Sequence, residues 1–423
     1  MSIHLVSAVD VKDFGAETVR VGDLNGDGAP DLLFVQSIYE TREITCLTAT
    51  TIFGEILWQK GTPSRDNGRI YSDLPVQVYD WDGDGESEVL YVRQARYAEP
   101  PWKGGVRERA TRYEGRATML VLDGKTGAEK ESFSIPAPAD DCFLLADLTG
   151  RGRREDLVVK DRYWTMWGVS HEGRTLWQWS GSTGHFPAIA DVDGDGRDEV
   201  FVGFALIDHD GHVLFEKDPE GAHQDACYVV RLDDGTWRLL FGNGGIHCLT
   251  ADGAELWHHP LAEAQHVVAG RFRTDSPVQF MVIDRGGPCG NGRAPATLYL
   301  YEQNGRVIWH RRQPEGSWAA AVVGIDWFGP GAALAAMVYS RGPREPVAIY
   351  DGTGDVVDVL RMEHTPDRTE QERRAGCYCT RADVWGDSRQ EVIMFGSRGA
   401  CIWANARPLA IPTLYNNTLY PGM

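Results

Sequence analysis

The chain has 423 residues, of which 42% are hydrophobic and 48 are glycine, and its formal net charge is −19. A chain of this length can bury a large apolar core, and its negative charge argues against nucleic acids and anionic membranes as partners. The start, "MSIHLVSAVDVKDFG", lacks the basic and apolar regions of a signal peptide, and no run of 18 apolar residues occurs. The sequence therefore predicts a cytoplasmic location, or secretion if a signal has been removed.

An acidic, glycine-containing pattern occurs in full three times. The copies are "VGDLNGDGAPDLLFV", "VYDWDGDGESEVLYV" and "AIADVDGDGRDEVFVG". Each places oxygen-bearing side chains at positions 1, 3, 5 and 9 of a turn, and these are Asp23, Asn25, Asp27 and Asp31, then Asp80, Asp82, Asp84 and Glu88, then Asp191, Asp193, Asp195 and Glu199. Hard oxygen ligands at this spacing suit Ca²⁺, while the flanks are short β-branched runs rather than the helices of an EF-hand. The sequence predicts calcium loops that join pairs of strands.

Five further copies keep the shape of the pattern and lose ligands. In "LADLTGRGRREDLVV" Asp147 remains and Arg151 stands at the third ligand position, where we expect its guanidinium to replace the metal. "TRADVWGDSRQEVIMFG" keeps its acids in part, and "VVRLDDGTWRLLFG", "VAGRFRTDSPVQFMVI" and "VGIDWFGPGAALAAMVY" keep only the strand–turn–strand shape. Eight copies at intervals of roughly 40 to 65 residues have the period of propeller blades.

Each copy continues with a third strand, a turn such as "LDGKTG" or "TADG", and a fourth strand such as "EILWQKG" or "RTLWQWS". This order predicts an all-β fold: an eight-bladed β-propeller with four antiparallel strands per blade and calcium loops between the first and second strands. Seven blades remain the alternative, if one degenerate copy is misread. Because the repeats run nearly end to end, we expect residues 1–423 to form a single domain.

Arginines gather in the loops that join second to third strands, on the face opposite the acidic loops. They are Arg42, Arg162, Arg285, Arg293, Arg341, Arg344 and Arg398. The longest insertion, in blade 2, adds Arg107, Arg109 and Arg112 with interleaved aromatic residues. Arginine binds carboxylates in a bidentate way and aromatic rings pack against sugars, so this face predicts an anionic oligo- or polysaccharide partner. The alternative is that these arginines are simply solvated.

Titratable residues precede the innermost strands of four successive blades. They are Asp141 in blade 3, His185 in blade 4, His223 with Asp225 in blade 5, and His266 in blade 6. A single histidine at such a position is more often a packing residue. Three that converge on one axis favour a functional site at the mouth of the channel.

The segment "TGHFPAIADVDGDGRDEVFVGFALIDHDGHVLF…GAHQDACYVV" resembles the rhamnogalacturonan lyases of polysaccharide lyase family 11, eight-bladed propellers with calcium loops. The loops alone are also similar to FG-GAP (integrin-type) repeats. The matching positions are His185, Asp191, Asp193, Asp195, Asp208, Asp210, His223, Asp225 and Ala226. The chain departs from the family in being shorter and in lacking its N-terminal β-sandwich and secretion signal, which suggests action on imported oligosaccharides.

The resemblance implies a polysaccharide lyase that cleaves rhamnose- and uronate-containing glycans by β-elimination. We expect His185 and His223 to be base and acid, with His266 next and Tyr163 as another possible acid. Arg162, Arg107, Arg109 and Arg112 would neutralise the uronate carboxylate, with Arg285, Asp141 and Asp225 also in the binding site. Two alternatives stay open: a rhamnosidase-type hydrolase that uses Asp141 and Asp225, and a non-catalytic calcium-stabilised propeller that binds a glycan or a protein.

Overall fold

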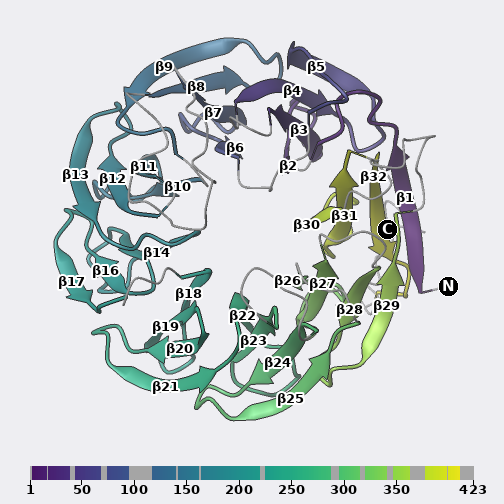
Figure 1. Ribbon diagram of the computed structural model, residues 1–423. Helices are drawn as coiled ribbons and strands as arrows, with labels where there is room; N and C mark the ends of the chain where they lie inside the picture. Colours follow the sequence, from purple (N-terminus) through teal and green to yellow (C-terminus); the bar gives the residue numbers. More distant parts are fainter. Residues whose placement is uncertain are drawn as a thin grey trace, which may run out of the picture.

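The computed structural model describes residues 2–16, 18–38, 43–67, 74–94, 117–139, 142–161, 163–219, 224–286, 295–314, 320–340, 346–362, 377–397 and 399–409. Its strands form eight four-stranded antiparallel sheets arranged in a ring (Figure 1). The predicted eight-bladed propeller is confirmed, and the seven-bladed alternative is wrong. In the part of the chain that the structure describes, no helix is long and apolar enough to cross a bilayer.

Blades 1 to 4 follow the chain in order, each with its innermost strand first. Blade 1 consists of β2 (Thr18–Gly22), β3 (Asp31–Ser37), β4 (Ile44–Thr50) and β5 (Ile56–Gly61). Blade 2 consists of β6 (Val76–Tyr79), β7 (Glu88–Gln94), β8 (Ala117–Asp123) and β9 (Glu129–Ile135). Blade 3 consists of β10 (Phe143–Ala146), β11 (Asp156–Lys160), β12 (Thr165–Val169) and β13 (Thr175–Ser180). Blade 4 consists of β14 (Ala188–Ala190), β15 (Glu199–Phe201), β16 (Ala205–Ile207) and β17 (Val213–Glu216).

Blades 5 to 7 continue in the same way, and blade 8 combines both ends of the chain. Blade 5 consists of β18 (Ala226–Arg231), β19 (Trp237–Gly242), β20 (Gly245–Leu249) and β21 (Glu255–Pro260). Blade 6 consists of β22 (Ala264–Gly270), β23 (Gln279–Asp284), β24 (Thr297–Tyr301) and β25 (Val307–Arg312). Blade 7 consists of β26 (Ala320–Ile325), β27 (Ala335–Ser340), β28 (Val347–Tyr350) and β29 (Val356–Leu360). Blade 8 consists of β30 (Tyr378–Ala382), β31 (Glu391–Gly396), β32 (Gly399–Asn405) and β1 (Ile3–Val9).

The ring is closed by β1, which pairs antiparallel with β32 from Ile3 opposite Asn405 to Val9 opposite Ala400 (Figure 1). The main-chain N–H of Ala406 also donates to the carbonyl of Ser2 at 2.9 Å. Blade 8 therefore takes its outermost strand from the start of the chain. This pairing satisfies the main-chain N–H and C=O groups along the outer edge of β32, which would otherwise be exposed.

Tryptophans on the outer strands link neighbouring blades. The indole of Trp58 in β5 donates to the carbonyl of Gly124 in blade 2 at 2.6 Å, and Trp177 in β13 donates to that of His209 in blade 4 at 2.7 Å. Trp257 and Trp309 make the same bond from blade 5 to blade 6 and from blade 6 to blade 7, at 2.8 and 3.0 Å. The recurrent Leu-Trp or Ile-Trp of the fourth strands thus fixes one blade against the next.

A buried carboxylate at the start of the second strand shapes the loop that precedes it. One of its oxygens accepts the N–H of the second loop residue, as in the bond from Val384 to Glu391 at 2.9 Å. The carboxylates that make this bond are Asp31, Glu88, Asp156, Glu199 and Glu391. The last ligand position of the sequence pattern is therefore also the residue that holds the turn closed.

Glu391 gives this arrangement a measurable pH dependence. Burial raises the pKa of its carboxyl from 4.5 to about 7, so the folded protein holds a proton that the unfolded chain releases. The contribution is fully present below about pH 4.5 and is lost as the pH rises through about 7, which lowers the unfolding free energy by roughly 1–3 kcal/mol.

We expect Glu391→Gln to remove this part of the pH dependence, because an amide oxygen still accepts the N–H groups of Val384 and Trp385. Denaturant unfolding at about pH 5 and about pH 8, in excess chelator, measures the effect. A variant that loses as much stability as the wild type between these pH values would contradict the assignment to Glu391.

Candidate functional site

The acidic loops lie between the first and second strands of their blades, as the sequence predicts. In blade 4 the carboxylate of Asp191 accepts the N–H groups of Gly194 at 2.7 Å and Gly196 at 3.1 Å. Both glycines have positive φ, 84° and 86°, so the chain turns tightly around the carboxylate. Asp193 in turn accepts the N–H of Asp195 at 2.9 Å. The loop thereby draws its acidic side chains together.

One group of carboxylates in blade 4 is suited to a cation. Asp191, Asp193 and Glu199 each offer an oxygen within 4.8 Å of the other two. Glu199 is buried, burial raises its pKa to about 7, and its Oε1 has no hydrogen-bond partner among the described residues. Such an oxygen is costly to bury as a charge unless a cation binds it. Asp195, Glu199 and His209 form a second, overlapping group of the same kind.

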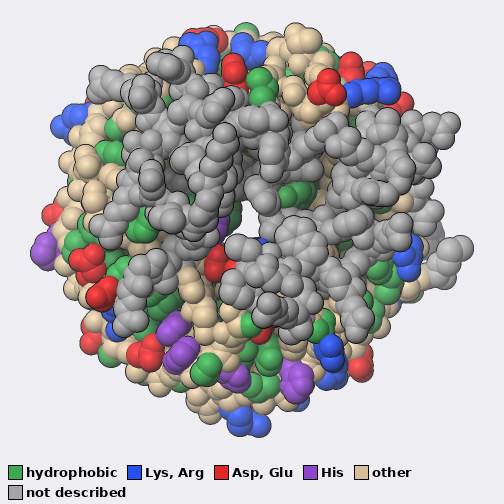
Figure 2. Space-filling model, viewed as in Figure 1, with side chains coloured by type: hydrophobic (Ala, Val, Ile, Leu, Met, Phe, Trp, Pro, Cys, Tyr) green, Lys and Arg blue, Asp and Glu red, His purple; other side chains and the backbone are tan. Residues whose placement is uncertain are grey.

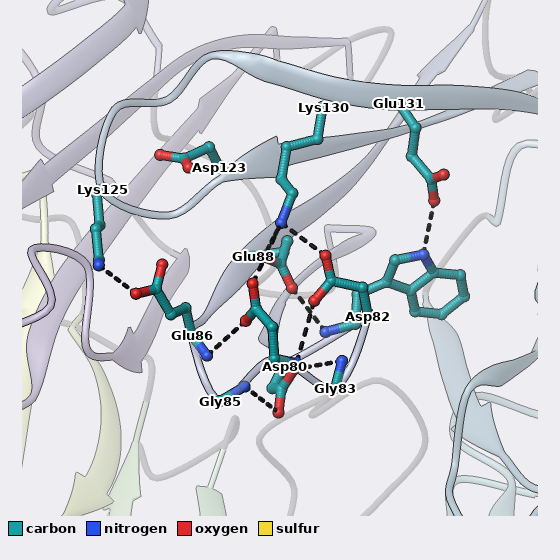
Figure 3. A network of polar contacts seen from close by, with 12 residues as sticks. Asp80, Asp82, Gly83, Gly85, Glu86, Glu88, Asp123, Lys125, Lys130 and Glu131 are labelled. Atoms are coloured by element: carbon teal, nitrogen blue, oxygen red, sulfur yellow. Dashed lines mark hydrogen bonds and ion pairs between the residues drawn. The ribbon is translucent and has the colours of Figure 1, made fainter.

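The blade 2 loop brings Asp80, Asp82 and Glu88 equally close, but a lysine reaches into it. Figure 3 shows Lys130 pointing from β9 between Asp82 and Glu88, with its Nζ 2.8 Å from an oxygen of each. The acids of this loop are therefore already paired within the chain.

The loops of blades 1 and 3 differ from both of these. In blade 1, Asn25 donates its side-chain amide to Asp27 at 3.1 Å, and burial raises the pKa of Asp31 to about 6. In the described parts of the chain, no group of three converging acids or histidines forms in loop 23–31. In blade 3 we expected the Arg151 guanidinium to replace a metal. Its side chain is half exposed, and it forms an ion pair with Glu155 at 2.6 Å.

On the other face of the ring, His185 and Asp225 come together. His185 lies in the connection from blade 3 to blade 4 and Asp225 in that from blade 4 to blade 5, with 3.8 Å between Nε2 and Oδ1. The buried ring of Tyr163 meets the imidazole edge-on, at 5.2 Å between centroids and 81° between planes. Three blades thus supply an imidazole, a carboxylate and a phenol to one place.

The local chain geometry holds His185 in this position. Its N–H donates to the carbonyl of Gln224 at 3.2 Å, next to Asp225 in the following blade. The preceding Gly184 has φ +58°, and a Cβ there would lie 2.2 Å from the Gln224 side chain. Glycine is therefore required for the two blade entries to approach one another.

The two remaining catalytic and substrate-binding candidates within the described residues belong to blade 6. His266 is in β22, just after a break in the pairing register with β23. Arg285 follows β23, and its guanidinium makes a bidentate ion pair with Glu263, at 2.6 Å for Nη2 and 3.2 Å for Nε. This arginine is thus paired with a carboxylate of the protein itself. Predicted residues that lie outside the described residues are His223, Arg162, Arg107, Arg109, Arg112, Asp141, Arg42, Arg293, Arg341, Arg344 and Arg398.

Sequence reasoning missed polar residues next to Tyr163. Lys160, which follows the apolar residues 157–159 at the end of β11, is buried, and its Nζ donates to the carbonyl of Asp161 at 3.3 Å. Asp161 accepts the N–H groups of residues 163 to 165 through Oδ1, while Oδ2 is buried with no partner in the described chain. A lysine that ends an apolar strand, followed by an aspartate, is the signal that could have identified them.

Two further buried oxygens belong to this sector. Gln224 donates its amide to the carbonyl of Thr183 at 3.3 Å, and Thr183 donates its N–H to the carbonyl of Tyr163 at 2.8 Å. The Gln224 Oε1 and the Thr183 Oγ1 have no partner within the described residues. Figure 2 shows an opening at the centre of the ring. The sector from blade 3 to blade 5 therefore combines an imidazole–carboxylate pair with oxygens able to bond a ligand's hydroxyls.

Comparisons with known proteins point to one family. The model of "Rhamnogalacturonan lyase family 11, C-terminal domain" matches residues 158–239, a range that contains Tyr163, His185 and Asp225. Among curated proteins, the rhamnogalacturonan exolyase YesX of Bacillus subtilis (strain 168) is 24% identical over 267 residues, covering 52% of this chain and 43% of that protein. The endolyase YesW of the same organism is also 24% identical over 267 residues, covering 52% of this chain and 42% of that protein. The match thus spans less than half the length of either relative.

Solved structures agree on the fold. The crystal structure of YesW superposes with a TM-score of 0.64 at 22% identity, covering 94% of this chain and 73% of that one. The biofilm matrix protein Bap1 of V. cholerae gives 0.63 at 14% identity, covering 96% of this chain and 92% of that one. Because both superpose about equally well, the fold alone does not separate a lyase from a matrix protein. The sequence matches are to the lyases: the chain is a rhamnogalacturonan lyase family 11-like β-propeller, distantly homologous to the two Bacillus proteins.

Proposed function

We propose that the protein is a polysaccharide lyase that cleaves rhamnose- and uronate-containing glycans by β-elimination. The observation that carries the proposal is the pairing of His185 with Asp225 beside Tyr163, inside the region that matches the family model. The homology to an exolyase and an endolyase supports the substrate class.

The reaction removes the proton on the carbon next to the uronate carboxylate, forms a carbon–carbon double bond and expels the oxygen at the β position, which takes up a proton and leaves as a hydroxyl; His223 is our candidate for the acid that supplies this proton. A neutral imidazole placed at that carbon accepts the proton, and we assign this role to His185. Asp225 orients the imidazole and stabilises its protonated form, while the buried Tyr163 ring fixes its tilt. Arginine at the uronate carboxylate would stabilise the charge that develops in the transition state, and Arg162, Arg107, Arg109 and Arg112 are the candidates.

We assign the metal to the opposite face. Asp191, Asp193 and Glu199 would hold Ca²⁺, since the buried Oε1 of Glu199 lacks a partner in the described chain and hard oxygen ligands suit this ion. When bound, the ion would offset two of the three negative charges that these carboxylates can carry. The loop between β14 and β15 and the connection that carries His185 lie at opposite ends of β14, so the ion stabilises the blade without reaching the reacting atoms.

His185→Ala should lower the rate of lyase product formation by about 10²–10⁴-fold, the usual contribution of general acid–base catalysis. The ultraviolet absorbance of the unsaturated uronate product, with rhamnogalacturonan as substrate, measures this rate. His212→Ala is the matched control, because His212 is an exposed histidine in the turn between β16 and β17. Wild-type activity in a folded His185→Ala protein would show that another residue is the base.

The product also distinguishes the alternatives. Cleavage of the glycan without ultraviolet-absorbing product would identify a hydrolase. Binding of the polysaccharide with no cleavage, unchanged in His185→Ala, would identify a non-catalytic propeller.

Removal of Ca²⁺ should lower the melting temperature, because an ion that binds only the folded state stabilises it by about 2.7 kcal/mol at about 100 times Kd. Asp193→Asn should remove most of the response to chelator, since it takes one charge from the blade 4 group. Differential scanning calorimetry in Ca²⁺ and in chelator measures both. Identical melting in the two conditions, with no Ca²⁺ found by elemental analysis of the wild type, would contradict the site.

A further inference from the structure

Lys130 stands at a special position of blade 2. The pairing of β8 with β9 shifts register between Leu122 opposite Glu129 and Val121 opposite Glu131, which leaves Lys130 as the unpaired bulge residue. The same bulge recurs in the other blades whose third and fourth strands follow directly along the chain. There the residue is aliphatic, namely Leu57, Leu176, Leu214, Leu256, Ile308 and Val357. Blade 2 alone among these carries a charge at the bulge.

The next residue of β9, Glu131, also differs from its equivalents in other blades. Glu131 pairs with Val121, where four of the other blades place the tryptophan that reaches the neighbouring blade. Its carboxylate accepts instead the indole N–H of Trp81 at 2.7 Å, and Trp81 belongs to the acidic loop between β6 and β7. Two successive residues of β9 are thus directed at the loop of their own blade.

The ammonium of Lys130 contacts the oxygens that a metal would use. Its Nζ lies 2.8 Å from Asp82 Oδ2, 2.8 Å from Glu88 Oε1 and 4.0 Å from Asp84 Oδ2. These are positions 3, 9 and 5 of the predicted calcium loop. The remaining acid at position 1, Asp80, has a nitrogen of Arg153 from the blade 3 loop at 3.5 Å. Charge in this loop is therefore compensated within the chain.

Blade 4 provides the comparison. Its loop carries acids at the same four positions, but the bulge residue above it is Leu214, which is 43% exposed and cannot compensate charge. None of Asp191, Asp193 and Glu199 pairs with a basic side chain in the described chain, and Glu199 keeps a buried oxygen without a partner. The two loops thus share one ligand pattern and differ in where their cation comes from.

We infer that Lys130 is a tethered cation that takes the place of the metal in blade 2, so that loop 80–88 binds no divalent ion although its sequence matches the calcium pattern. An ammonium on a side chain of the same fold remains in place when Ca²⁺ is depleted. Blade 2 therefore keeps its loop ordered independently of calcium. The inference rests on the proposed calcium site only for the comparison with blade 4.

Bound Ca²⁺ per chain, counted by elemental analysis after equilibrium dialysis, tests the inference. Asp82→Asn in the otherwise wild-type protein should leave the count unchanged, whereas Asp193→Asn should lower it by one. Lys130→Met keeps an unbranched side chain of similar length and removes the charge. This variant should bind one more Ca²⁺ than the wild type. Combining it with Asp82→Asn should abolish that gain, which places the new ion in loop 80–88.

Lys60→Met is the matched control, because Lys60 lies in β5 at the end of the strand away from the acidic loops, and it should leave the count unchanged. A folded Lys130→Met protein with no added Ca²⁺ overturns the inference, as does loss of an ion in Asp82→Asn alone. If Lys130→Met does not fold, the count for Asp82→Asn decides, together with that for Lys130→Gln. Failure of the proposed calcium site would appear separately, as an unchanged count in Asp193→Asn.

Discussion

A carboxylate buried at the start of the second strand is the constraint on which the loop between the first and second strands depends in five of the eight blades. It closes the turn by accepting a main-chain N–H, yet a charge removed from water is costly unless it is compensated. The blades meet this cost in different ways. In blade 3 the Asp156 carboxylate accepts four hydrogen bonds, three from residues 148 and 149 and one from the N–H of His171. Blade 2 uses a lysine, and blade 4 has the arrangement that suits an ion from solution.

The same strand pattern separates the two kinds of chemistry. Every strand spans the ring from one face to the other, so the turns that carry acids and the connections that carry His185 and Asp225 are at opposite ends of the blades. Charge compensation on one face stabilises strands whose other ends hold the imidazole. The bond from the Trp177 indole to the carbonyl of His209 adds a second restraint, since it fixes blade 3 against blade 4, two of the blades that contribute to the site.

Repetition made most of the architecture readable. The same four-stranded repeat is predicted independently by the eight loops, by the recurring turns and by the Trp-containing fourth strands. The structure confirms the eight four-stranded blades. The sequence also singles out His185, because histidines precede the innermost strands of successive blades, whereas Tyr163 lies between the second and third strands of blade 3; their catalytic roles stay predictions. Lys160, Thr183 and Gln224 were missed because they are single departures from the repeat. A residue that occurs in one of the eight repeats cannot be recognised from periodicity. Its burial and its contacts in the folded protein are what draw attention to it.

The sequence by itself predicted eight blades, with seven as the open alternative, and it determined the strand order within a blade and the face on which each loop lies, because these follow from local patterns repeated along the chain. The tertiary structure decided which distant residues compensate one another. It brought β1 to β32, His185 to Asp225, and Lys130 to a loop that begins 50 positions earlier. A ligand pattern records the acids of a loop, but the cation that neutralises them can come from another strand or from solution. That choice depends on distances that only the folded ring establishes.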